Sequence, residues 1–113
     1  MSFDTRTFRD ALGLFVTGVT VITARSRSGE KVGVTANSFN SVSMSPPLIL
    51  WSLGRTSRSI DAFMDASHFC VHILREDQTE LATRFATSGI DKFEGLELEP
   101  GAGSVPMLAD CAA

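Results

Sequence analysis

Two short polar stretches of the sequence hold the side chains whose types and spacing could do chemistry. In the first, residues 52–59 (SLGRTSRS), hydroxyls, a glycine and two arginines come directly before a predicted short helix. Backbone N–H groups at a helix start, together with arginine, favour a phosphate or another anion. The same composition would also suit an ordinary helix cap with solvated arginines. The sequence alone leaves these two interpretations open.

The second polar stretch, residues 35–39 (TANSF), stands at the end of a predicted strand. Its donors and acceptors carry little bulk, which suits the rim of a site for a planar heterocycle. Asn and Ser are also common in ordinary turns. Arg84 and Phe85, on a later predicted helix, could add a cation and an aromatic wall, although Phe85 also lies on the apolar stripe of that helix.

Other kinds of chemistry find little support in the sequence. His68, Cys70 and His72 alternate along a predicted strand, but the two histidines would lie about 13 Å apart, too far for a shared metal ion. No nucleophile motif accompanies these histidines. The glycines at 29–31 and 101–106 lack the spacing of the P-loop and dinucleotide motifs. We therefore expect no metal ligands and no catalytic acid, base or nucleophile.

Composition limits the class of protein. The chain has 113 residues, 43% of them hydrophobic and 20% charged, with a net charge of −3, as expected for one globular domain without nucleic acid as a partner. Its apolar runs are too short for a membrane span, and its first residues lack the pattern of a secretion signal, so we expect a cytoplasmic protein that is not bound to a membrane. Cys70 and Cys111 are expected to be reduced thiols.

The predicted elements alternate between strands and short helices. Hydrophobic patterning predicts strands over residues 19–24, 31–35, 48–53 and 68–74, the third of them buried. It also predicts a helix that begins at Asp4 or Thr5, with an apolar face made of Phe8, Ala11, Leu12 and Phe15. A second, short helix is capped by Thr56 or Ser57 and has Ile60, Phe63 and Met64 at helical spacing. A third helix begins with a capping box of Asp77 and Glu80 and has an apolar stripe of Leu81, Ala82 and Phe85, and a loop is predicted from Glu97 onward. The loop between the first two strands is too short for a parallel crossover, so we expect an antiparallel core and a small barrel.

Four segments together carry a resemblance to a known family. They are residues 8–23 (FRDALGLFVTGVTVIT), 33–39 (GVTANSF), 41–48 (SVSMSPPL) and 81–85 (LATRF). In order and spacing they resemble the short-chain flavin reductase family, the reductase partners of two-component flavin monooxygenases. The resemblance implies a mainly β fold with helices, the FMN-binding split barrel, which is an antiparallel Greek-key-type β-barrel. It also implies that the single domain over residues 1–113 covers about the N-terminal two thirds of the usual one, so that the barrel is incomplete and the family's Gly-Asp-His motif is missing from this chain.

The resemblance further implies a homodimeric NAD(P)H-dependent flavin reductase that uses NADH or NADPH to supply reduced FMN or FAD to a partner monooxygenase. By position, Thr35, Ala36, Asn37 and Ser38 would line the flavin ring and ribityl chain, Ser52, Leu53, Arg55, Thr56 and Ser57 would follow the ribityl chain and phosphate, and Arg84 and Phe85 would close the pocket. Hydride transfer requires only that nicotinamide C4 be held against flavin N5, which agrees with the missing catalytic groups. The alternatives are a non-catalytic flavin-binding module and a related split-barrel oxidase.

Overall fold

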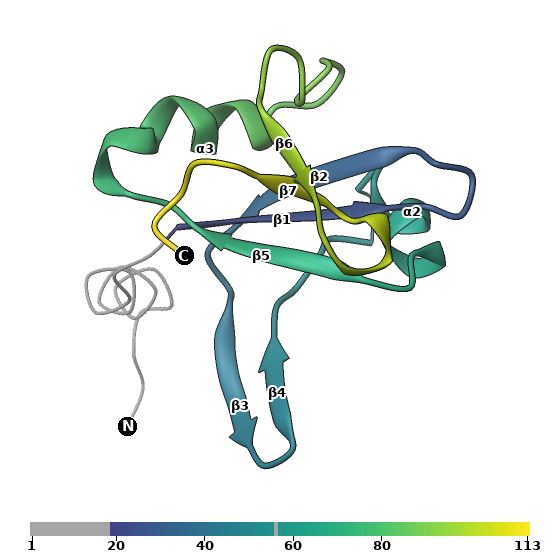
Figure 1. Cartoon of the computed structure of the whole chain (residues 1–113), viewed down its shortest axis with the longest axis vertical. Helices are drawn as coiled ribbons and strands as arrows, with labels where there is room; N and C mark the ends of the chain where they lie inside the picture. The colour runs from purple at the N-terminus through teal and green to yellow at the C-terminus, as the bar shows by residue number, and fades with distance from the viewer. Residues whose placement is uncertain (1–18, 56) are drawn as a thin grey trace, which may run out of the picture.

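The computed structural model describes residues 19–55 and 57–113. The helix predicted from Asp4 or Thr5 and the predicted cap Thr56 lie outside the described residues. The described chain forms a three-stranded antiparallel sheet in the order β2-β1-β5, a β3–β4 hairpin and a β6–β7 hairpin (Figure 1). This mainly β fold with a few short helices agrees with the predicted class, and its open sheets fit an incomplete barrel.

The elements follow one another along the chain with short connections. The strands are β1 (Thr20–Arg25), β2 (Lys31–Ala36), β3 (Asn40–Met44), β4 (Pro47–Leu50), β5 (Phe69–Ile73), β6 (Leu98–Pro100) and β7 (Pro106–Leu108). The α-helices are α2 (Ile60–Asp65) and α3 (Thr79–Phe85), and the 3-10 turns are η1 (Glu76–Gln78) and η2 (Ala102–Ser104). None of the helices in the two described ranges has the length and hydropathy needed to cross a bilayer.

Strand β1 is the centre of the fold. It is rich in β-branched residues, which suit a strand that packs on both faces, and five of its six residues, Thr20, Val21, Ile22, Thr23 and Ala24, are at most 1% exposed. It pairs antiparallel with β2, where Val21 lies opposite Thr35, and with β5, where Val21 lies opposite His72. The predicted strands over residues 19–24, 31–35 and 68–74 and the antiparallel core are thus confirmed.

Two clusters of buried side chains hold the layers together. The larger one joins Val21 and Leu74 to Phe85 of α3, Phe93 and Leu108 of β7. The β6–β7 hairpin crosses the central sheet (Figure 1), and the Thr23 hydroxyl donates to the Pro106 carbonyl at 2.5 Å. The smaller cluster joins Ala24 and Val32 to Ala62 of α2. The predicted apolar stripe of α3 therefore faces the core.

Several local predictions were wrong. The strand predicted to be buried over residues 48–53 is β4, which ends at Leu50 and is exposed along its whole length. The reason is that β4 pairs only with β3, in a hairpin that projects from the rest of the described chain (Figure 1). No strand was predicted at β3, which supplies that partner.

The remaining errors concern helix starts and the last segment. The region after Glu97 forms the β6–β7 hairpin rather than a loop, because its two prolines fall at the hairpin end, where no ladder bond needs their missing N–H groups. Helix α2 begins after Ser59 rather than Ser57, and Met64 on it is 81% exposed. The capping contact before α3 is the Arg75 N–H donating to Gln78 Oε1 at 2.9 Å, in place of the predicted Asp77 and Glu80.

Candidate functional site

A pocket of about 780 Å³, here called the first pocket, lies between three segments of the chain. Its walls are residues 30–35 of β2 and the preceding turn, residues 52–54 and 57–59 after β4, and residues 85–86 and 88–93 at and beyond the end of α3. This volume falls within the range of about 300–1,000 Å³ that is usual for small-molecule and cofactor sites.

The first pocket unites the two polar stretches that the sequence analysis singled out. The backbone N–H of Ser52 donates to the Ser38 hydroxyl at 2.9 Å, so the end of β2 and the exit of β4 lie side by side. The β3–β4 hairpin makes this possible, because it returns the chain to the place where β2 ended. Among the predicted site residues, Thr35, Ser52, Leu53, Ser57 and Phe85 line the pocket.

The loop over residues 52–59 is held by its own hydrogen bonds. The Ser57 N–H donates to the Gly54 carbonyl at 3.0 Å, and the Ser59 N–H donates to the Ser57 hydroxyl at 3.2 Å. The exposed side chain of Arg58 reaches the pocket from this loop. Because α2 has only six residues, the attraction for an anion rests on the Arg58 charge and not on a helix dipole.

The floor of the first pocket is aromatic and closely packed. Phe85 is fully buried and meets Phe93 edge to face, with ring centroids 5.2 Å apart. A Cβ atom on Gly33 would lie 2.4 Å from Phe85 Cε1, so any other residue there would require the Phe85 ring to shift. Lys92 links β2 to the end of α3, because its ammonium donates to the carbonyls of Gly33 at 2.9 Å and Phe85 at 2.8 Å. Burial lowers the pKa of Lys92.

Two predicted site cations do not line the first pocket. Arg55 lies in the exposed turn of the same loop, outside the lining residues. Arg84 donates to the Glu94 carbonyl and lines a different pocket beside η1. The predicted contact at Thr56 falls outside the described residues.

The other three residues of the Thr-Ala-Asn-Ser stretch do not line the first pocket. Ala36 is buried at the end of β2, where its carbonyl accepts a hydrogen bond from the Thr20 hydroxyl at 2.5 Å. Asn37 is exposed. Ser38 acts through the backbone of Ser52 and thereby positions the second stretch.

Three charged residues of the first pocket were not among the predicted site residues, namely Lys31, Arg58 and Lys92. Arg58 belongs to the polar stretch over residues 52–59, but the sequence does not show that Arg58 rather than Arg55 lines the pocket. Lys31 lies with its ammonium 5.4 Å from the centre of the Phe93 ring. No local signal could have placed Lys31 and Lys92 in one pocket, because β2 and the segment after α3 come together only in the folded chain.

The chemistry of the lining fits a flavin nucleotide. Such a group needs room for a flat ring, partners for a polyhydroxyl chain and positive charge for a phosphate. The first pocket offers hydroxyls from Thr35, Ser52, Ser57 and Ser59, and its charged residues are Lys31, Arg58 and Lys92 against Glu30 and Asp91. The pocket therefore has an excess of positive charge, although the whole chain is acidic.

The histidine and cysteine pair on β5 has a structural role. His72 Nδ1 lies 2.9 Å from the Val21 carbonyl and donates to it, because Nε2 accepts the Leu108 N–H at 3.0 Å. Burial lowers the pKa of His72 and raises that of the neighbouring Cys70. Cys70 and Cys111 are free thiols. Within residues 19–55 and 57–113, no three His, Cys, Asp or Glu side chains gather closely enough to hold a metal ion.

Comparison with known proteins gives the family. The flavin reductase-like domain matches residues 12–113. The FMN reductase (NADH) SmoA of Agrobacterium fabrum is 46% identical over 105 residues, which are 93% of this chain and 59% of that protein. A solved homologue of nitrilotriacetate monooxygenase component B from Mycobacterium thermoresistibile is 40% identical, with a TM-score of 0.81 over 96% of this chain and 60% of that one.

A second solved structure is a complex with ligands. The NADH:FAD oxidoreductase SgcE6 of Streptomyces globisporus, in complex with NAD and FAD fragments, is 31% identical, with a TM-score of 0.76 over 98% of this chain and 68% of that one. The chain spans less than two thirds of the length of the curated relatives it matches. With the matched residues and the shared fold, the chain belongs to the flavin reductase-like domain family.

Proposed function

We propose that this chain forms the flavin-binding part of an NAD(P)H-dependent flavin reductase, which supplies reduced FMN or FAD to a partner monooxygenase. The observation that carries the proposal is the first pocket, where the Ser38–Ser52 hydrogen bond joins two separate polar stretches beside an aromatic floor. The relatives support the same function. SmoA is named an FMN reductase (NADH), and another relative is named the reductase component of a flavin-dependent trigonelline monooxygenase.

In this proposal, different lining residues contact different parts of the flavin. Thr35 and Leu53 would hold the ring system, Ser52 and Ser57 the ribityl chain, and Arg58 the phosphate, with Phe85 beneath. When bound, the flavin accepts a hydride from the nicotinamide and carries the electrons onward. The chain's own residues bind and orient it, and they exclude water from its buried side. This work needs no acid, base or nucleophile from the protein.

Flavin titration of arginine variants tests the site. We expect Arg58→Ala to weaken FMN binding about tenfold, the loss of one charge-assisted contact at an exposed side chain. Arg27→Ala is the matched control, because Arg27 is an exposed arginine 3.7 Å from Asp65 and does not line the pocket. Flavin fluorescence quenching gives the affinities.

The double variant Arg55→Ala, Arg84→Ala separates two views of the phosphate site. The family resemblance expects this variant to lose affinity, whereas the pocket geometry expects it to bind FMN as the unchanged chain does. Loss of affinity in the double variant with normal binding by Arg58→Ala would show that Arg58 does not bind the phosphate.

The reaction is tested by following the nicotinamide absorbance of NADH or NADPH with free FMN or FAD. Flavin-dependent loss of this absorbance over many turnovers supports a reductase. A yellow protein that binds flavin tightly without turnover would support the non-catalytic binding module. Turnover that needs a permanently bound flavin and a different substrate would support a split-barrel oxidase.

The proposal includes a second copy of the chain as partner. Five apolar side chains of the β3–β4 hairpin are exposed, namely Val42 (59%), Met44 (91%), Leu48 (50%), Ile49 (43%) and Leu50 (57%). A dimer that covers this hairpin would remove these side chains and the free strand edges from water. Sedimentation of the unchanged chain should give a dimer, and the double variant Leu48→Ser, Leu50→Ser should give a monomer.

The proposal places the protein in the cytoplasm, and the two free thiols support this compartment.

A further inference from the structure

A second pocket, of about 370 Å³, lies beside η1 and α3. It shares no lining residue with the first pocket. Helix α3 separates the two, because Glu80, Leu81 and Arg84 line the second pocket whereas Phe85 lines the first. The second pocket is thus a distinct cavity, and the proposed flavin site gives it no role.

The inner part of the second pocket is apolar. Leu81, Leu96 and Leu108 line it from α3, the segment before β6 and β7. Leu108 is only 6% exposed and belongs to the main core, and the other two leucines pack against that core. A cavity with such a lining favours the apolar part of a ligand, since binding removes apolar surface from water.

The rim of the second pocket has an excess of negative charge. Its charged residues are the carboxylates of Asp77, Glu80, Glu97 and Asp110 and the guanidinium groups of Arg75 and Arg84. Four carboxylates against two guanidinium groups leave two negative charges uncompensated. Hydrogen bonds from Arg75 hold the pKa of Asp110 below its usual range, so the Asp110 carboxylate keeps its charge at neutral pH.

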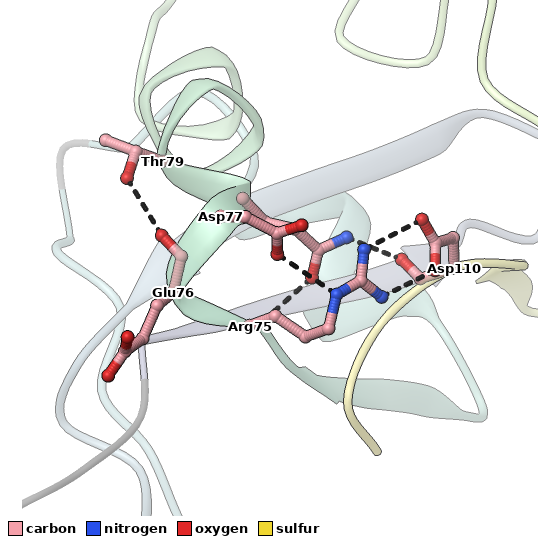
Figure 2. A network of polar contacts seen from close by, with 6 residues as sticks. Arg75, Glu76, Asp77, Thr79 and Asp110 are labelled. Atoms are coloured by element: carbon pink, nitrogen blue, oxygen red, sulfur yellow. Dashed lines mark hydrogen bonds and ion pairs between the residues drawn. The ribbon is translucent and has the colours of Figure 1, made fainter.

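Both guanidinium groups already have partners within the protein. Figure 2 shows Arg75 between two carboxylates, with Nη1 and Nη2 at 2.5 and 3.0 Å from the oxygens of Asp110 and Nε at 3.0 Å from Asp77. Gln78 adds a donor to the Asp110 carbonyl at 2.8 Å. Arg84 donates to the Glu94 carbonyl. An incoming anion would have to compete with these contacts, whereas Glu80 and Glu97 make no ion pair among the described residues.

We propose that the second pocket binds a small organic cation, with an ammonium group on a compact apolar body. The apolar body would contact Leu81, Leu96 and Leu108, and the ammonium would lie toward Glu80 and Glu97. Opposite charge near a protein surface attracts across a few ångströms, and it repels an anion by the same amount. The proposal does not depend on flavin binding.

Calorimetry with three matched ligands tests the proposal on the 113-residue chain. The probes are benzyltrimethylammonium, neutral benzyl alcohol and anionic benzenesulfonate. We expect the cation to bind at least about fivefold to tenfold more tightly than the alcohol, and the sulfonate to bind more weakly than either, because the negative rim attracts the cation and repels the anion. Amide NMR shifts should fall on residues around Leu81, Leu96 and Ala109.

Variants show which charges select the ligand. The double variant Glu80→Gln, Glu97→Gln should bind the cation no more tightly than the alcohol. Glu99→Gln is the matched control, because Glu99 is an exposed carboxylate of β6 that does not line the pocket. The proposal fails if the alcohol or the sulfonate binds as tightly as the cation, if no cation binding is detected, or if the NMR shifts lie elsewhere. The ligand comparison on the unchanged chain decides the matter even if the double variant does not fold.

Discussion

Replacing Gly33 with alanine should destabilise the protein, although one methyl group is the smallest possible addition. The new Cβ would lie 2.4 Å from Phe85 Cε1, 2.6 Å from Phe85 Cδ1 and 3.3 Å from Phe93 Cζ. Carbon atoms in contact prefer about 3.5–4.0 Å, so the first two distances fall short by about 1 Å. The Phe85 ring cannot yield easily, because it is fully buried and packs edge to face on Phe93.

The expected magnitude combines two opposing effects. An added methylene in a packed core costs about 1–3 kcal/mol of unfolding free energy. Alanine in place of glycine also restricts the unfolded chain, which returns about 0.4–1 kcal/mol. We therefore expect Gly33→Ala to lower the unfolding free energy by about 1–2 kcal/mol, and to lower the urea midpoint by about 0.5–1 M for a typical slope.

Gly54→Ala is the matched control for this measurement. Gly54 also lines the first pocket, but a Cβ there would meet no atom within 4 Å. Only the unfolded-chain effect remains, so this variant should be as stable as the unchanged chain or slightly more stable. Urea unfolding followed by circular dichroism compares the two variants under identical conditions.

A double variant tests whether the clash with Phe85 is the cause. Phe85→Leu removes the ring edge that the new methyl would meet, so Gly33→Ala should cost at least about 0.5 kcal/mol less in the Phe85→Leu background. Gly33→Ala that is as stable as Gly54→Ala would refute the packing argument. An equal cost of Gly33→Ala in both backgrounds would show that another contact is responsible.

Two further predictions concern protonation and the chain end. Burial lowers the pKa of His72 below its ordinary 6.5, so the unfolded chain takes up the proton first. The contribution of neutral His72 to the unfolding free energy is therefore complete above about pH 6.5, and it decreases as the pH falls toward the pKa of His72 in the folded chain. Urea unfolding between pH 5 and about 8 should show this decrease, and His72→Gln should flatten it. Asp110→Asn should speed hydrogen exchange at the Ala112 and Ala113 amides, which both donate to the Ile73 carbonyl, because it weakens the Arg75 contacts that hold this segment; unchanged exchange would show that the segment is held without Asp110.

Local patterns predicted the central sheet but not its surroundings. Residues 20–24 are all β-branched or apolar, and this composition favours a strand that packs on both faces. Strand β3 contains Asn40, Ser41 and Ser43, residues typical of turns, and it is a strand because β4 pairs with it. Burial of β4 could not be read from Leu48 and Leu50, because burial depends on what packs against a hairpin rather than on the hairpin itself.

Sequence patterns singled out the two polar stretches that meet at the first pocket, but they could not give the direction in which single side chains point. The two polar stretches did come together, since each marks the end of a strand. Arg84 and Phe85 could not both reach the first pocket. Successive residues of an α-helix point about 100° apart, so with Phe85 directed into the floor, Arg84 faces the second pocket.

The same helix also restricts what Thr35 can offer to a ligand. The Thr35 hydroxyl donates its only proton to the Ala82 carbonyl at 2.5 Å, and this hydrogen bond links β2 to α3. Toward the first pocket, Thr35 has only oxygen lone pairs left, and these accept a hydrogen bond. A ligand recognised at Thr35 must therefore present a donor there. Since α3 also forms one wall of the second pocket, a displacement of this helix by a ligand in that pocket would move the Thr35 anchor and the Phe85 floor together.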